Sequence, residues 1–255
     1  MFIIKPFNLV FFCFLAFIAL TIIILTKILK NKSIGVKKLI LLIIGCANIV
    51  LWIFYKIWLY QGVEVLNETG YVFNIYKELP LHMCNVSIIL FVIGLLTDKK
   101  IIYSYCFYFA PLGALLAFVT PSNGFSGNSL FALHNVGYYF THALIIINGI
   151  LLVTLKLFKP NYKNALKASL MVLLLSVLAH AINYFFLYVC HQETDYFYTM
   201  HVTNISLLNV IWDILPIRLL YLLPPFILFG ALLLVLTIPF ELSYKKENKK
   251  NYQNN

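Results

Sequence analysis

Long apolar runs separated by short polar segments make up most of the chain. Seven runs are long enough to cross a bilayer, and they cover residues 7–29, 38–60, 79–97, 101–119, 134–157, 166–190 and 216–240. A membrane-spanning helix needs about 20 mainly apolar residues. The runs are continuous and lack the apolar–polar alternation that a membrane β-barrel requires. The pattern therefore predicts an all-α membrane protein with a bundle of seven transmembrane helices.

Composition strengthens this prediction and excludes a soluble protein. Of the 255 residues, 62% are hydrophobic and only 11% are charged, and the mean hydropathy is +0.90. A soluble domain normally carries about 25% charged residues. The seven runs leave no room for a soluble domain. We therefore predict one transmembrane domain over residues 1–244 and a basic, disordered cytoplasmic tail over residues 245–255.

The positive charges predict how the bundle is oriented. Most of the 19 Lys and Arg residues fall after runs one, three, five and seven, which places them on one side: Lys27, Lys30, Lys32, Lys37, Lys38, Lys99, Lys100, Lys156, Lys159, Lys163, Lys167, Lys245, Lys246, Lys249 and Lys250. Lys and Arg concentrate in cytoplasmic loops. We therefore predict that the amino terminus lies outside and the carboxyl terminus lies in the cytoplasm. The net charge of +10 then favours an anionic membrane surface, and not nucleic acid, as partner.

Polar side chains within the apolar runs mark a candidate site. Such groups are costly in hydrocarbon and usually face a cavity or one another. With the predicted orientation, seven of them converge in the outer half of the bundle: His82, Cys84 and Asn85 in the third run, His142 in the fifth, and His180, Asn183 and Tyr184 in the sixth. The inner half has no comparable set.

Cys84 is the strongest nucleophile candidate among these residues. A lone cysteine in a span is usually a small hydrophobe, but Cys84 lies close to a helix start marked by Pro80. Unpaired N–H groups at a helix start favour a thiolate and can hold a developing oxyanion. His82 is two residues away, so a helix turns it about 200° from Cys84. Either His142 or His180 remains open as the base.

The remaining polar residues have simpler interpretations. We expect the outer acids Glu64, Glu68, Glu78, Glu193 and Asp195 to form a solvated rim without a chemical role. Lys56 is expected to extend its ammonium outward to the interface. The five cysteines are scattered without metal-ligand or redox spacing. No metal site and no cofactor are therefore expected.

The segment Leu79-Pro80-Leu81-His82-Met83-Cys84-Asn85 resembles the Leu-Pro-Leu-His-x-Cys motif of the YwaF-like family of bacterial integral membrane proteins. That family is related to an animal seven-span acyltransferase that remodels ether phospholipids. Thr120-Pro121 followed by Gly124 and the triplet 182–184 are also similar, and the resemblance covers nearly the whole chain. It implies a multi-pass protein of the bacterial inner or plasma membrane. It also implies that Cys84 and His142 form the functional pair.

Two classes of function follow. The first is a membrane acyltransferase that acts on lipids, with Cys84 as nucleophile and His142 as base. In this hypothesis the other five polar residues bind substrate: His82, Asn85, His180, Asn183 and Tyr184. The alternative is a small-molecule transporter or ligand-binding protein that uses the same cavity without covalent chemistry. The sequence shows no inverted repeat of the kind found in many transporters.

Overall fold

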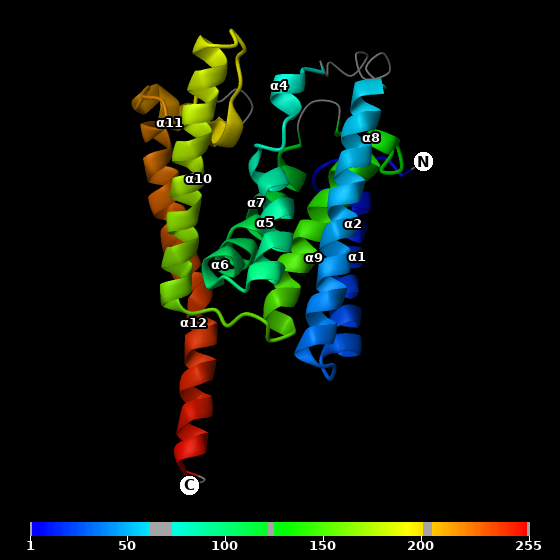
Figure 1. The fold of residues 1–255 in the computed structure, drawn as a ribbon, viewed down its shortest axis with the longest axis vertical. Coiled ribbons are helices and arrows are strands. Elements are labelled where there is room, and N and C mark those ends of the chain that lie inside the picture. Colours follow the sequence, from blue (N-terminus) through cyan, green and yellow to red (C-terminus); the bar gives the residue numbers. More distant parts are fainter. Residues whose placement is uncertain (1, 62–72, 122–124, 201–205, 254–255) are drawn as a thin grey trace.

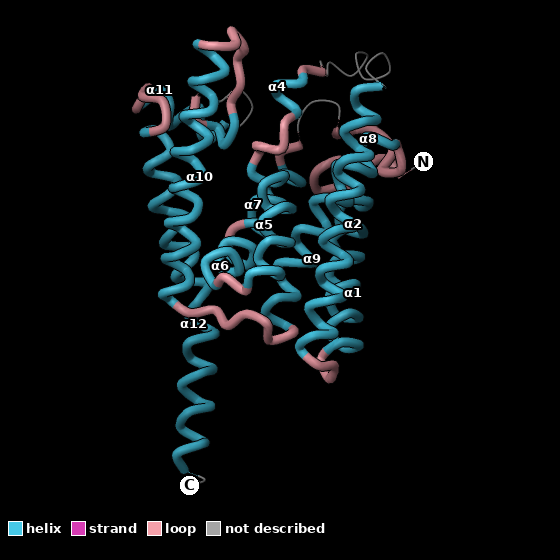
Figure 2. Tube along the Cα trace, in the orientation of Figure 1, coloured by secondary structure: helices cyan, strands magenta, loops and turns pink. Residues whose placement is uncertain are grey.

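Helices are the regular secondary structure throughout the described part of the chain. The computed structural model describes residues 2–61, 73–121, 125–200 and 206–253. Within these ranges strand-like pairing is limited to one isolated bridge between Ile3 and Ser129. Loops connect the helices mainly at the two ends of the bundle (Figure 2). The predicted all-α class is confirmed.

The helices differ widely in length. The longer ones are α1 (Leu9–Leu29), α2 (Ile34–Gln61), α5 (Met83–Thr97), α6 (Lys100–Tyr108), α7 (Ala110–Val119), α9 (Thr141–Thr154), α10 (Tyr162–Tyr188), α11 (Ser206–Ile214) and α12 (Leu223–Gln253). Short helices lie mostly near the end of the bundle that carries the amino terminus: α4 (Ile75–Glu78), α8 (Leu133–Asn135), the π-helix η1 (Val136–Phe140), and the 3₁₀ helices η2 (Tyr196–Tyr198) and η3 (Leu220–Leu222).

The bundle has a buried centre and two flanking helix pairs (Figure 1). α1 and α2 form one flank, and α10 with α12 forms the other. α5, α6, α7 and α9 lie between them, and α9 packs against α1, α2, α5, α6 and α7. The amino and carboxyl termini lie at opposite ends of the molecule. Because α9 touches most of the other helices, the polar residues that it carries are enclosed.

Within the described residues, six helical stretches are long and apolar enough to cross a membrane: Leu9–Leu29, Ile34–Gln61, Lys100–Val119, Leu133–Thr154, Tyr162–Tyr188 and Leu220–Lys246. The third predicted run, 79–97, is helical only over Met83–Thr97, which is 15 residues. This helix measures about 22 Å, less than the roughly 30 Å of a hydrocarbon core. It starts late because residues 79–82 form a turn, in which Leu81 N donates to Leu79 O over 2.7 Å.

The stretch Lys100–Val119 is broken between α6 and α7. The break lies at Phe109, and Pro111 has no N–H group for the Phe107 carbonyl. Gly149 of α9 packs directly against this break. A Cβ atom at Gly149 would lie 2.4 Å from the Cys106 carbonyl oxygen and 2.6 Å from Pro111 Cγ. Glycine is therefore required at residue 149 for the observed approach of α9.

The carboxyl-terminal tail differs from the prediction of disorder. In the structure α12 continues through the basic segment as far as Gln253. Lys, Glu and Gln are good helix formers, and Glu241 precedes Lys245 with the i,i+4 spacing that favours a helix. Extension from an existing span also avoids the cost of starting a new helix.

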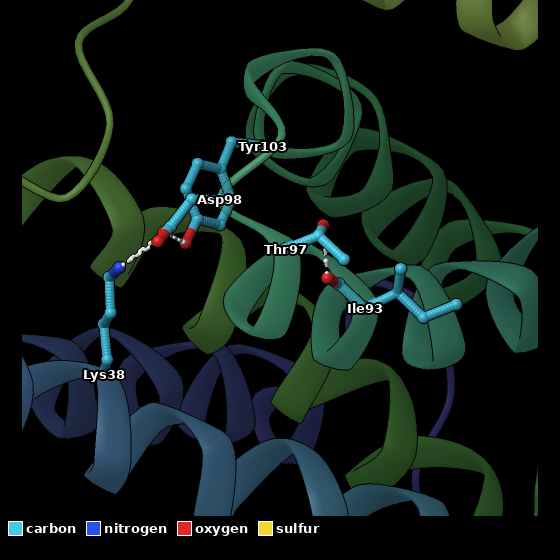
Figure 3. Close-up of polar contacts among 5 residues, drawn as sticks. All are labelled: Lys38, Ile93, Thr97, Asp98 and Tyr103. Atoms are coloured by element: carbon cyan, nitrogen blue, oxygen red, sulfur yellow. Dashed lines mark hydrogen bonds and ion pairs between the residues drawn. The ribbon is translucent and has the colours of Figure 1, made fainter.

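An ion pair ties three helices together at the end of the bundle opposite α4 (Figure 3). Lys38 Nζ of α2 donates to Asp98 Oδ2 over 2.6 Å, and the Tyr103 hydroxyl of α6 donates to Asp98 Oδ1 over 2.9 Å. Asp98 follows α5 in the left-handed region, with φ 54°, and its N–H donates to Gly94 O. Hydrogen bonds from Lys38 and Tyr103 lower the pKa of Asp98.

We expect Asp98→Asn to lower thermal stability at neutral pH, by about 0.2–1 kcal/mol for such an exposed pair. Asn tolerates the left-handed backbone, so the change removes mainly the charge. Because the folded-state pKa of Asp98 is depressed, its contribution is present above the unfolded pKa of about 3.9 and is lost as the pH falls through the folded value. Melting curves of wild type and variant between pH 7 and pH 3 should converge at the acidic end. A constant difference across this range would contradict the assignment.

Candidate functional site

Cys84 is the second residue of α5. His82 is the N-cap of this helix, and the first backbone hydrogen bond runs from Val86 N to His82 O over 3.0 Å. The N–H groups of residues 83–85 therefore precede the intrahelical ladder. The half-buried Cys84 side chain packs against the main hydrophobic core. The predicted position of Cys84 beside a helix start is confirmed, with the start at Met83 and not at Pro80.

His142 lies in the first turn of α9, directly after the π-helix η1. Its Nδ1 atom is 2.7 Å from the backbone oxygen of Tyr138. A carbonyl can only accept, so Nδ1 carries the proton and Nε2 is the basic nitrogen of the neutral ring. π-helical turns inside helices are frequent at functional sites. The local backbone thus fixes the tautomer that a general base needs.

Tyr138 connects the surroundings of the two predicted catalytic residues. Its ring lies 4.6 Å from the His142 ring, between centroids, and its hydroxyl donates to Ala117 O over 2.7 Å. Tyr138 also interacts electrostatically with Cys84 and with Tyr198. Within the described ranges no hydrogen bond joins Cys84 to His142. Tyr138 therefore lies in the neighbourhood of both residues.

His82 and Asn85 have different surroundings from Cys84. The His82 Nε2 atom donates to Lys77 O over 3.0 Å, and its ring packs edge-to-face on Tyr196 at 4.8 Å. Residues 79–86 thus place the His82 ring against Tyr196 of η2, whereas the Cys84 side chain packs against the main hydrophobic core. Asn85 is half-buried in the first turn of α5. The predicted separation of His82 from Cys84 is in keeping with these contacts.

Lys56 and Glu78 form an ion pair that the sequence analysis missed. Lys56 Nζ of α2 contacts Glu78 Oε2 at the end of α4, and the two side chains are 19% and 14% exposed. Glu78 is therefore not part of a solvated rim, and Lys56 does not extend into the interface. Residues 73–78 come beside α2, where the Phe73 ring also packs on Tyr60 at 5.4 Å between centroids, and both charged groups are mostly buried. Lys56 also interacts electrostatically with His82 and His142.

The other rim acids have varied positions. Glu193 is exposed, as predicted. Asp195 accepts a hydrogen bond from Met200 N over 2.8 Å, so it helps to shape the chain around η2. Glu64 and Glu68, together with Gly124 of the Thr-Pro motif, lie outside the described residues.

Asn183 holds the outer segment, residues 194–199, against α10. Its Nδ2 donates to Tyr196 O at 3.0 Å and Thr199 Oγ1 at 2.9 Å. Its Oδ1 accepts from Thr194 Oγ1 at 2.8 Å and Tyr196 N at 3.0 Å. The side chain is fully buried. Because an amide has two donor hydrogens and two main acceptor positions, the outer segment uses the whole hydrogen-bonding capacity of Asn183.

His180 and Tyr184 form a separate group on α10. Their rings meet edge-to-face at 4.7 Å, and the Arg218 guanidinium lies 5.9 Å from the Tyr184 ring. The described residues show no hydrogen bond or ring contact between His180 and either Cys84 or His142. The seven predicted site residues therefore fall into two groups, one at α5 and α9 and one on α10. Tyr196 of the outer segment joins them, because its ring contacts His82 edge-to-face and its backbone bonds to Asn183.

Three tyrosines near the site escaped the sequence analysis, because Tyr at helix ends is common in membrane interfaces. Tyr138, Tyr196 and Tyr198 lie in this region, and Tyr196 is fully buried. The spacing of Tyr138 from His142 is i,i+4, which places both on one helical face. This spacing from His142 was the one feature of the sequence that could have identified Tyr138 as a neighbour of the site. The positions of Tyr196 and Tyr198 depend on the outer segment, which has no helical periodicity.

Comparison with known families identifies the chain. A family model described as the TMEM164 family matches residues 3–241, so the chain belongs to that family, which is a membrane protein family. No curated protein and no solved structure matches the chain. Together with the six apolar helices, the family establishes a multi-pass membrane protein.

We expect Asn183→Leu to lower the free energy of unfolding by at least about 2 kcal/mol, because several buried polar groups of the outer segment lose their partner. Thermal unfolding in detergent, followed by circular dichroism, measures this loss. Asn85→Leu is the matched control, since Asn85 is half-buried and has no side-chain hydrogen bond within the described residues. Equal losses for the two variants would show that Asn183 does not hold the outer segment.

Proposed function

We propose that this protein is a membrane acyltransferase that acts on lipids through a covalent Cys84 intermediate, with His142 as general base. The tautomer of His142 carries the proposal, because the Tyr138 carbonyl holds the proton on Nδ1 and leaves Nε2 basic. The resemblance of residues 79–85 to the YwaF-like motif, and the acyltransferase related to that family, support the same pair. No metal or cofactor is needed for this chemistry.

In the first step the Cys84 sulfur attacks the acyl carbonyl of a lipid ester. His142 Nε2 takes the thiol proton, and the carbonyl oxygen becomes an oxyanion that the N–H groups at the start of α5 can stabilise. The carbon–oxygen bond of the ester then breaks, and His142 returns the proton to the leaving alkoxide. The products are an acyl thioester on Cys84 and a lysolipid alcohol.

In the second step an acceptor hydroxyl attacks the thioester. His142 Nε2 takes the hydroxyl proton, the carbon–sulfur bond breaks, and the proton returns to the Cys84 thiolate. Water would compete with the acceptor hydroxyl, because its attack would hydrolyse the thioester without transfer of the acyl group. The packing of Cys84 against the hydrophobic core supports selective transfer, because it limits access of water.

We assign His82, Asn85, His180 and Tyr184 to the walls of the substrate site, and Asn183 to holding the outer segment over it. His82 meets Tyr196 of that segment, and Tyr184 meets Arg218. Arg218 offers a positive charge to an anionic lipid head group. Membrane lipid is accordingly the proposed partner.

We further propose seven membrane crossings, with α5 as the third, in a bacterial plasma membrane. α5 is one of the central helices (Figure 1). The turn at residues 79–82 continues the chain from the start of α5 toward the outer end of the bundle. The distribution of lysines supports an outer amino terminus and a cytoplasmic carboxyl terminus.

Reporter fusions test this topology. A fusion after Asn128 should report the outer side of the membrane, and a fusion after Asn255 should report the cytoplasm, because the fifth, sixth and seventh crossings lie between these two residues. Alkaline phosphatase and green fluorescent protein are suitable reporters, since each is active on one side only. Both fusions reporting the same side would refute seven crossings.

The covalent mechanism predicts an acyl adduct on Cys84 that hydroxylamine removes. Purified protein incubated with an acyl-donor lipid should show the adduct by mass spectrometry. Cys84→Ser should lose most activity, because a hydroxyl is far harder to deprotonate than a thiol. His142→Ala should slow adduct formation by about 10²–10⁴-fold, the usual range for loss of a general base.

Two variants serve as controls for this experiment. Cys190→Ser removes another half-buried cysteine and should leave the adduct intact, whereas His82→Ala should act mainly through stability or substrate binding. An unmodified Cys84, together with a Cys84→Ala protein that complements a deletion strain, would refute covalent catalysis. The transporter or ligand-binding hypothesis would then replace it.

A further inference from the structure

A small polar cavity lies in the middle of the bundle, among α2, α5, α6, α7 and α9. Asn48 of α2, Ser87 and Phe91 of α5, Cys106 of α6 and Asn148 of α9 line it. Its volume is about 10 Å³, close to the minimum that one water molecule needs. The cavity adjoins the α6–α7 break, where Gly149 brings α9 against the Cys106 carbonyl.

Two side-chain oxygens in this cavity need a donor. Asn48 and Asn148 are 1% and 2% exposed, and their Oδ1 atoms have no hydrogen-bond partner among the described residues. The orientation of Asn48 is fixed, because its Nδ2 donates to Thr141 O over 3.3 Å. A buried acceptor without a donor is destabilising, so two such atoms lining one cavity point to a shared ligand.

The neighbouring groups supply no donor of their own to these oxygens. The Ser87 hydroxyl lies 2.8 Å from Met83 O and 2.9 Å from the Tyr105 hydroxyl, so its one hydrogen is engaged with one of these two oxygens. The Cys106 thiol is a weak donor and a weak acceptor. A ligand that satisfies both amide oxygens must therefore donate two hydrogen bonds, one to each.

We propose that this cavity binds one water molecule that bridges Asn48 Oδ1 and Asn148 Oδ1. A water has two hydrogens, one for each oxygen, and can accept from the Cys106 thiol. A monovalent cation fits the oxygens less well, because the residues lining the cavity include no carboxylate and an uncompensated charge is costly at this depth in a membrane. The bridge joins α2 to α9, and through Asn48 it also holds the Thr141 carbonyl, one residue from His142.

Radiolytic hydroxyl-radical labelling of the full chain in lipid nanodiscs tests the site, because radicals formed from a bound water label the side chains beside it. Phe91 lines the cavity and is 4% exposed. Phe14 is the matched control, since it is 5% exposed and packs among the rings of Phe118, Tyr139 and Phe140. We expect Phe91 to be labelled several-fold faster than Phe14. Equal rates would overturn the proposal without any variant.

The double variant Asn48→Leu/Asn148→Leu gives a second readout. It removes both acceptors and fills the cavity with methyl groups, so labelling of Phe91 should fall to the rate of Phe14. Unchanged labelling of Phe91 would overturn the bridge. A melting temperature of the wild-type protein that rises with sodium chloride but not with choline chloride would also overturn it, in favour of a cation. None of these measurements depends on the acyl-transfer hypothesis.

Discussion

Water is scarce in the hydrocarbon core of a membrane, so a polar group there needs a hydrogen-bond partner inside the bundle. In this bundle several of the described polar side chains meet that requirement with hydrogen bonds between helices, whereas the Oδ1 atoms of Asn48 and Asn148 find no protein donor among the described residues. Asn48 bonds to the Thr141 carbonyl, Tyr138 to the Ala117 carbonyl and Tyr108 to Thr237. These bonds cross between helices, and they fix rotation and depth in an environment where apolar side chains contact lipid as readily as one another. The placement of the candidate site follows from this constraint.

The same requirement explains the Lys56–Glu78 pair. A lysine in the outer part of a span can reach the interface with its ammonium, and that was the expectation from sequence. The alternative is a carboxylate brought to the lysine, and Glu78 at the end of α4 provides it. Such a pair is weak evidence for stability, because desolvation of both charges offsets their attraction. Lys56 of this pair also interacts electrostatically with His82 and His142.

The apolar runs predicted the helices well, because a span must be long and continuously hydrophobic whatever it packs against. Six of the seven runs became helices that can cross a membrane, and the shortened start of α5 is a local effect of the 79–82 turn. Contacts between helices were harder to predict. Depth alone grouped His180 with His142, but depth does not report which face of each helix points inward. Asn183 had the sequence signature of a site residue, yet its role depends on a non-periodic segment 11–16 residues further along the chain.

Acyl transfer in a membrane needs a base that is neutral at rest and correctly oriented, because a permanently charged imidazolium could not accept a proton. In the proposed mechanism the π-helix η1 supplies this orientation. It brings a backbone carbonyl of the preceding turn to His142 Nδ1, so orientation requires no carboxylate and adds no charge to the bundle. A carboxylate in that position would orient the ring equally well, but it would demand its own compensation in hydrocarbon. The carbonyl of Tyr138 is therefore the partner for His142 that suits a membrane site, and the tyrosine ring packs on the same imidazole at 4.6 Å between centroids.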